Sequence, residues 1–280
     1  MPLQDQERTF DMIKSIYITF YVVFLLVGGV ISTIHFNENI LSIGRFAAIT
    51  AFLTGWIWWI YVFTVRLRNA MFASMVVTVA TATSLLIAIG SHYISGDGSL
   101  FSVSMCLAAL VSWLVYHLLI SRMRNLRDTL KPGELFPDAQ VIDANGQTMQ
   151  LASLPGKKMF LFHRGKWCPF CVEQVTEFNE ALDAYETKGV RIYSISADQP
   201  RHLPASNFVA FQDPKGELGK TLGILVKNGL PFGFQIFGFR SDQFEPLGVL
   251  VDENMRIIAA HKPKDNRNRS TPQWFLRFLN

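Results

Sequence analysis

Polar and apolar residues divide this chain into two different halves. Between Ser15 and Ser121 charged residues are rare, and long apolar stretches alternate with short polar breaks. Four stretches approach the ~20 apolar residues that an α-helix needs to cross the hydrocarbon core of a bilayer. They are residues 13–34, 46–65, 70–89 and 100–120. The pattern predicts an α-helical transmembrane bundle, because a soluble bundle would need charged faces that these segments lack.

After Ser121 charges become dense and the apolar residues follow shorter patterns. These patterns predict strands at residues 140–143, 147–151, 159–162, 190–196 and 208–211, and a hairpin of 247–252 with 256–260. Helices are predicted from the helical spacing of Val175 to Tyr185, ended by Gly189, and at residues 214–222 and 273–279. A strand, a helix and a strand in succession favour a parallel βαβ unit. The second half is therefore predicted to be an α/β domain, in which residues 225–245 match no pattern.

Basic residues at the ends of the apolar segments predict an orientation. Lys and Arg accumulate in the cytoplasmic connections of membrane proteins. Here they cluster after the second and fourth segments, at Arg66, Arg68, Arg122, Arg124, Arg127 and Lys131. We therefore expect a multi-pass integral membrane protein with the α/β domain on the cytoplasmic side. The expected divisions are a membrane region at 1–121, a basic connector at 122–134 and the α/β domain at 135–280.

Two cysteines lie where the predicted strand 159–162 meets the following helix. Cys168 and Cys171 are separated by two residues, with Pro169 after the first, so both thiols fall in the first helical turn. Free N–H groups and the positive end of the helix dipole favour a thiolate there. Arg164 and Lys166 can add positive charge. Cysteines at this spacing can close a disulfide and reopen it by exchange.

A zinc site and a pair of unreactive structural thiols are the alternatives to redox chemistry. Zinc would need two further Cys or His ligands. The third cysteine, Cys106, lies far upstream in an apolar segment. We therefore favour a redox pair and expect neither a metal nor a cofactor.

A group of cations near the C-terminal end allows three interpretations. These are Lys262, Lys264, Arg267 and Arg269. They could rest on anionic lipid headgroups, bind nucleic acid or belong to a solvated loop. Because the group lacks an aromatic platform or a recognition helix, we expect no nucleic-acid partner and favour the solvated loop.

Several motifs of the second half occur in an order and spacing that extend over about 150 residues. They are Pro132-Gly-Glu-Leu-Phe-Pro-Asp138, Asp143-Ala-Asn-Gly146, Arg164-Gly-Lys-Trp-Cys-Pro-Phe-Cys171, Ile195-Ser-Ala-Asp198, Gln212-Asp-Pro-Lys-Gly-Glu217 and Glu245-Pro-Leu-Gly-Val-Leu-Val-Asp252. With them, residues 131–280 resemble the redoxin group of the thioredoxin-fold superfamily, which includes the AhpC/TSA peroxiredoxins. The resemblance implies a thioredoxin-like domain, with a central mixed sheet and flanking helices, and a thiol-dependent oxidoreductase.

The resemblance implies a choice between two chemistries. A peroxiredoxin usually has Thr three residues before its attacking Cys and Arg just before the late strand. Here those positions hold Cys168 and Pro246, as in thioredoxin-like disulfide exchangers, whose proline is expected to be cis. We therefore expect a membrane-tethered thiol-disulfide oxidoreductase in which Cys168, nearer solvent, attacks a protein disulfide and Cys171 resolves the mixed disulfide. Trp167 would shield the pair and Pro246 would shape the substrate groove.

Two further functions remain open. In a peroxiredoxin-like thiol peroxidase Cys171 would attack the hydroperoxide and Cys168 would resolve the sulfenic acid. Either enzyme needs an external thiol reductant. Alternatively, the pair could be a redox sensor without turnover, coupled to the bundle in the lipid bilayer.

Overall fold

The computed structural model describes residues 3–38, 42–65, 69–94, 100–123, 130–199 and 206–279. The chain divides into two compact units, one of residues 16–65 and 70–122 and the other of residues 1–15, 66–69 and 123–280. Of the cations that predict the orientation, Arg66, Arg68, Arg124 and Arg127 lie outside the described residues.

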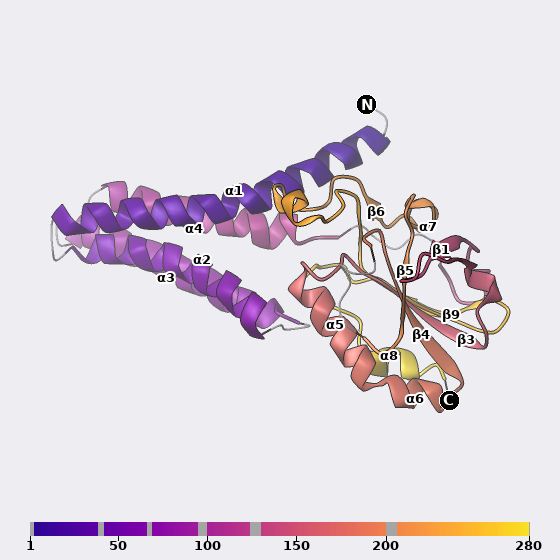
Figure 1. Cartoon of the computed structure of the whole chain (residues 1–280). Coiled ribbons are helices and arrows are strands. Elements are labelled where there is room, and N and C mark those ends of the chain that lie inside the picture. Colours follow the sequence, from indigo (N-terminus) through magenta and orange to yellow (C-terminus); the bar gives the residue numbers. More distant parts are fainter. Residues whose placement is uncertain are drawn as a thin grey trace. The chain divides into compact units, whose positions relative to one another are not determined.

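Long helices make up the first unit (Figure 1). They are α1 (Leu3–Glu38, of which residues 3–15 belong to the other unit), α2 (Ile43–Val65), α3 (Met71–Ile94) and α4 (Leu100–Val115), which continues as a π-helix over Tyr116–Ile120. Four stretches are long and apolar enough to cross a membrane: Asp11–Ile34, Ile43–Val65, Met71–Ile94 and Leu100–Ile120. They overlap the four predicted segments, and the third extends five residues beyond the predicted end, to Ile94.

Small residues let α1 and α2 approach closely. A Cβ atom at Gly28 would lie 2.2 Å from the Phe52 ring, and one at Gly55 would lie 2.6 Å from Leu25. Close approach at small residues is typical of helices that associate in lipid, where packing replaces the hydrophobic effect.

The second unit is built on a seven-stranded mixed sheet with the order β2-β1-β5-β4-β3-β8-β9. Its strands are β1 (Gln140–Ile142), β2 (Thr148–Gln150), β3 (Lys157–Phe162), β4 (Val190–Ser196), β5 (Val209–Gln212), β8 (Leu247–Val251) and β9 (Ile257–His261). β3, β4 and β5 are parallel, as the βαβ pattern predicted, and the other neighbours are antiparallel. Four long apolar helices followed by a mixed-sheet domain confirm the predicted fold class.

The helices of this unit are short. They are α5 (Pro169–Glu180), α6 (Leu182–Glu186), α7 (Glu217–Leu222) and α8 (Pro272–Leu276), with 3-10 turns at Leu151–Ser153 and Phe234–Phe237. The helix predicted to run to Gly189 is interrupted at Ala181, which ends α5 and begins α6. In the region that matched no pattern, β6 (Leu225–Val226) pairs with β7 (Gln243–Phe244).

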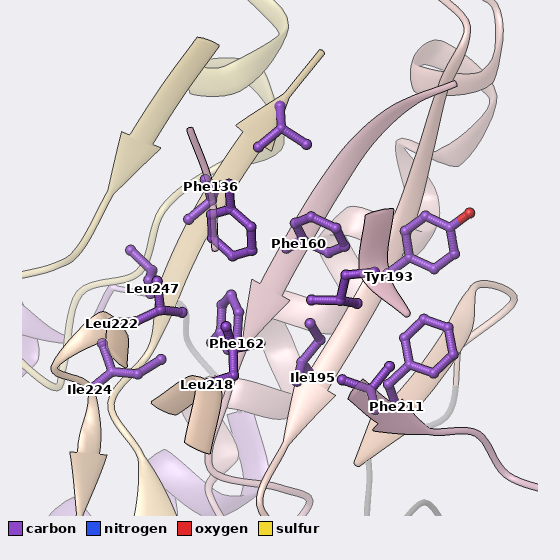
Figure 2. Close-up of a cluster of buried hydrophobic side chains, with 14 of the residues drawn as sticks. Phe136, Phe160, Phe162, Tyr193, Ile195, Phe211, Leu218, Leu222, Ile224 and Leu247 are labelled. Carbon is purple, nitrogen blue, oxygen red and sulfur yellow. The ribbon is translucent and has the colours of Figure 1, made fainter. Parts of the chain in front are cut away.

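Two hydrophobic layers cover the faces of the sheet. Successive side chains of a strand point to opposite faces, so Phe160 and Phe162 of β3 lie in one layer (Figure 2). Met159 and Leu161 lie in the other, together with residues of α5, α6 and α8. The second layer holds α5, and with it the cysteine pair, against the sheet.

Candidate active site

The cysteine pair lies at the N-terminus of α5, after the loop that follows β3. Cys168 is the N-cap residue, and Pro169 occupies the first turn with a φ that suits a helix start. The backbone N–H groups of Cys171 and Val172 donate to the carbonyl oxygen of Cys168 at 3.0 and 3.1 Å. Both thiols are free. This geometry places the two sulfur atoms in one helical turn.

Both thiols are buried. The exposed fraction is 2% for Cys168 and 0% for Cys171. Cys168, which was expected to lie nearer solvent, is only slightly more exposed than Cys171, and both side chains are covered. A substrate reaches either sulfur only after the covering side chains have moved.

The two thiols have opposite pKa shifts. The pKa of Cys168 is lowered because the Cys171 thiol donates a hydrogen bond to its sulfur, and the charges of Arg269 and Arg164 act in the same direction against the effect of burial. The pKa of Cys171 is raised by burial first, and then by its hydrogen bond to Cys168 and the charge of that sulfur. Of the two thiols, Cys168 is therefore the one that ionises first.

The cation in contact with both sulfurs is Arg269, for which the sequence favoured a solvated loop. That interpretation is wrong for Arg269, Arg267 and Lys262, which are 2%, 1% and 8% exposed. The Nη2 of Arg269 lies 3.8 Å from the Cys168 sulfur and 3.9 Å from the Cys171 sulfur. Its Cζ lies 5.7 Å from the centre of the Phe170 ring. Arg267, in contrast, forms an ion pair with Asp265 at 2.7 Å.

Hydrogen bonds to three neighbours hold the Arg269 segment in place. The Asn266 side chain accepts from Arg269 Nη2 at 2.8 Å. The next residue, Ser270, accepts at its carbonyl from Gln174 Nε2 of α5 at 3.2 Å, and its hydroxyl lies 2.6 Å from His261 Nδ1 of β9. Arg269 is thus tied to the same helix as the cysteines. No local sequence motif could have identified Arg269 as part of the site, since it lies 101 residues beyond Cys168.

Trp167 is fixed on both its polar and its apolar side. Its Nε1 donates to Gln243 Oε1 at 3.3 Å, and Gln243 Nε2 donates to the buried Asp198 at 3.2 Å. Its ring packs edge-on against Phe234, with the centroids 6.1 Å apart. Trp167 therefore links the cysteine loop to residues that lie far along the chain.

Pro246 is buried directly before β8, at the level where β3 ends. β3 pairs Phe162 with Leu247, so this register places Pro246 beside His163. All peptide bonds of the described residues are trans. The expectation of a cis proline is therefore wrong in this structure.

The predicted supporting cations differ in position. Arg164 is half-buried, and its charge lowers the pKa of Cys168. Lys166 is exposed. Gly165 between them has a φ of 103°, a left-handed conformation that favours glycine and turns the chain from β3 towards α5.

His163 adds no positive charge to the site. It is buried, and burial lowers its pKa to about 4. Its Nδ1 accepts from the backbone N–H of Gly165 at 3.1 Å, so the proton of the neutral ring is on Nε2. His163 thus shapes the loop in its neutral form.

Comparisons with known proteins concern this second unit. The model of the AhpC/TSA family matches residues 132–260. Thiol-disulfide oxidoreductase ResA of Bacillus cereus is 30% identical over 132 residues, which are 47% of this chain and 70% of that protein. A peroxiredoxin of Aeropyrum pernix is 27% identical over 168 residues, covering 50% of this chain and 66% of its own. The solved structure of peroxidoxin BcpB from Mycobacterium tuberculosis aligns with a TM-score of 0.44 at 14% identity, over 54% of this chain and 96% of that one.

Proposed function

This chain belongs to the AhpC/TSA family, and on that premise we propose that it is a membrane-tethered thiol-disulfide oxidoreductase. Relatives named thiol-disulfide oxidoreductase and peroxiredoxin make it a thiol-dependent oxidoreductase. The proposal of disulfide exchange is carried by one observation, the opposite pKa shifts of the two cysteines: the pKa of Cys168 is lowered and that of Cys171 is raised. Disulfide exchange needs one thiolate that attacks and one thiol that waits.

In the first step the Cys168 thiolate attacks one sulfur of a substrate disulfide. A mixed disulfide forms, and the other substrate sulfur leaves as a thiolate. The hydrogen bond from the Cys171 thiol keeps Cys168 ionised, together with the two guanidinium groups and the helix N-terminus, although burial opposes this.

In the second step Cys171 attacks the Cys168 sulfur. The raised pKa of Cys171 falls once Cys168 has lost its negative charge, because that charge is one cause of the shift. The Cys171 proton passes to the departing substrate sulfur. The substrate has then gained two electrons, the pair has become a disulfide, and an external thiol reductant restores the dithiol.

The apolar helices support the membrane-tethered part of the proposal. Four stretches have the length and composition of transmembrane helices, and we place the redox domain on the cytoplasmic side from the charges of the connections. A reporter that is active only outside the cytoplasm, fused after Asn280, should be silent. An active reporter would show that the orientation or the number of spans is wrong.

The catalytic proposal is tested with the full-length chain in lipid nanodiscs and a protein disulfide as substrate. Cys171→Ser should accumulate a mixed disulfide on Cys168, detected as a mass adduct that a small thiol removes. Cys168→Ser should form no adduct on Cys171. Trapping on Cys171 instead would reverse the two roles, and a wild type that reacts only once per chain with excess reductant would be a sensor.

A second candidate function is favoured by one contact. In a thiol peroxidase a guanidinium beside the attacking sulfur stabilises the charge that develops on the departing oxygen, and Arg269 is in that position. The pKa values favour Cys168 as the attacking residue. It would take one oxygen from the hydroperoxide as a sulfenic acid and release an alcohol, and Cys171 would then displace water to form the disulfide.

Parallel kinetics separate the two candidates. We expect peroxide consumption to be well below disulfide reduction at matched concentrations, because Cys168 replaces the Thr of a peroxidase, and because Pro246 replaces its Arg while Arg269 comes from a different part of the chain. Faster consumption of peroxide, with a sulfenic acid on Cys168 in the Cys171→Ser variant, would make peroxide the substrate.

A further inference from the structure

A loop beside the redox site exposes large apolar side chains to the surroundings. We call residues 231–239 the aromatic loop; its sequence is PFGFQIFGF and it contains no charged residue. Phe232, Ile236 and Phe237 are 60%, 81% and 64% exposed. In residues 130–199 and 206–279 they account for three of the six exposed large hydrophobic side chains. A cluster of this kind marks an interaction site.

The aromatic loop has a defined conformation. Its 3-10 turn, Phe234–Phe237, is flanked by Gly233 and Gly238, both in the left-handed conformation. Directly after the loop, the backbone N–H of Arg240 donates to the buried Asp198 at 2.7 Å. The exposed side chains are therefore held outwards by structure on both sides.

The same loop touches the redox motif. Phe234 packs against Trp167, the residue before Cys168. Asp198 accepts from Arg240 and also from Gln243, which in turn accepts from the Trp167 indole. A surface that receives the aromatic loop would thus lie close to the cysteine pair.

Charge and chain connectivity favour a lipid bilayer as the surface that receives the aromatic loop. The aromatic loop lies between Lys227 and Arg240, and residues 226–241 contain no Asp or Glu. Positive charge without acidic residues suits an interface with anionic lipids. Within the same unit, the N–H of Phe232 donates to the carbonyl of Ser15 at 3.4 Å, and the Ser15 hydroxyl donates to the carbonyl of Leu230. Ser15 lies near the start of the stretch Asp11–Ile34, which is long and apolar enough to cross a membrane.

We propose that the aromatic loop is an interfacial anchor that inserts Phe232, Ile236 and Phe237 into the headgroup region of the bilayer that holds α1–α4. The proposal rests on the membrane tether of the proposed function. Its consequence concerns the substrate: the enzyme acts on disulfides that membrane-bound proteins present close to the lipid surface.

Depth-dependent quenching tests the insertion without any catalysis. The full-length chain carries Cys106→Ala, Cys168→Ser and Cys171→Ser, and a fluorophore is attached through either Ile236→Cys or Leu135→Cys. Leu135 is the matched control, since it is 65% exposed in the same unit but outside the loop. In nanodiscs of phosphatidylcholine and phosphatidylglycerol, nitroxide lipids should quench the label at 236 from a depth of about 5–10 Å, and the label at 135 much less.

Equal quenching at the two positions would overturn the proposal. So would a label at 236 that lipid leaves unquenched but that becomes shielded when a disulfide-containing protein is added, since the loop would then bind polypeptide.

Kinetics connect the anchor to the substrate class. The double variant Ile236→Asp and Phe237→Asp should reduce a lipid-anchored disulfide about tenfold more slowly than the wild type. The helices α1–α4 still tether the variant, but the cysteine pair is no longer held at the lipid surface, where the effective concentration of this substrate is high. Its rate with a soluble disulfide should be unchanged. Equal losses with both substrates would contradict the anchor. If the wild type reduced neither substrate, the proposed function would fail, while the quenching result would still decide the insertion.

Discussion

The two units of this protein differ in where their large apolar side chains lie, which is the interior in one unit and the surface in the other. In the α/β unit, large apolar residues such as Phe160 and Phe211 are fully buried. In the helical unit, Phe72 and Leu86 are 80% and 68% exposed, whereas Ser74 and Ser102 are fully buried. Hydrophobic sequence therefore does not by itself mean a buried side chain. The helical unit has the arrangement expected in hydrocarbon, where apolar side chains face lipid and small hydroxylated residues line the helix contacts.

The cysteines continue this comparison. Cys106 of α4 and Cys168 are both almost completely buried. Cys106 lies in a helix without charged residues, while Cys168 lies at a helix N-terminus beside Arg269. Reactivity in this chain should therefore follow the charges around a thiol and not its exposure.

The largest effect should separate these two cysteines. Cys168→Ser should lower the rate of disulfide reduction by at least about 10⁴-fold, because the attacking sulfur is lost. Cys106→Ala should leave the rate within about twofold, as expected of a small packing residue. Turnover by purified full-length protein measures both. A comparable loss in Cys106→Ala would mean that the helical unit takes part in the reaction.

The next effect concerns stability and contrasts the two kinds of apolar residue. Phe160→Ala should lower the free energy of unfolding of the α/β unit by about 3–5 kcal/mol, because it leaves a cavity between sheet and covering residues. Leu86→Ala, on the exposed face of α3, should change stability by less than about 0.5 kcal/mol. Denaturant titration of full-length protein in nanodiscs, with domain-specific probes, compares them. Equal losses would show that Leu86 packs against another protein surface.

Arg269 gives the third effect, on the pH dependence of Cys168. Arg269→Met should raise the pKa of Cys168 by about 1 or more, since a neighbouring opposite charge is lost. The midpoint of alkylation at Cys168 should then move to higher pH, and below it the rate should fall about tenfold for each pKa unit. Arg269→Lys keeps the charge and should restore part of the shift.

Cys171→Ala serves as a control for this measurement. It removes the thiol that donates to Cys168 and puts no donor in its place, so it should raise the same pKa through a different cause. If Arg269→Met left the alkylation midpoint unchanged, the guanidinium would have a purely structural role.

The smallest effect tests the hydroxyl groups between the helices. Trp113 Nε1 of α4 donates to Thr78 Oγ1 of α3 at 2.8 Å. Thr78→Val removes the acceptor at similar volume and should destabilise the helical unit by about 0.6 kcal/mol. Thr78→Ser should retain the stability. Unfolding in mixed micelles measures the difference in the free energy of unfolding. A loss above about 2 kcal/mol would indicate that no water molecule replaces Thr78 as the acceptor for the Trp113 indole.

Local pattern was sufficient for most elements and for the position of the redox pair. The four apolar segments, the strands of the α/β unit and the helix start at Cys168 each depend on residues within a few positions, and their periodicity is visible along the chain. The glycine- and phenylalanine-rich stretch 225–245 has no such periodicity. Its two-residue strands, β6 and β7, pair only with each other, so neither is visible before the chain brings Leu225 beside Phe244.

By itself, therefore, the sequence determined an apolar helical half, an α/β half and a pair of cysteines at a helix start. Only the tertiary structure decided that both thiols are covered, that Arg269 contacts them and that Phe232 and Ile236 face outwards. Each of these depends on residues that are far apart along the chain and meet only after the sheet has formed. The pKa of a buried thiol is set by the charges a few ångströms away, and no spacing in the sequence records which charge will be there.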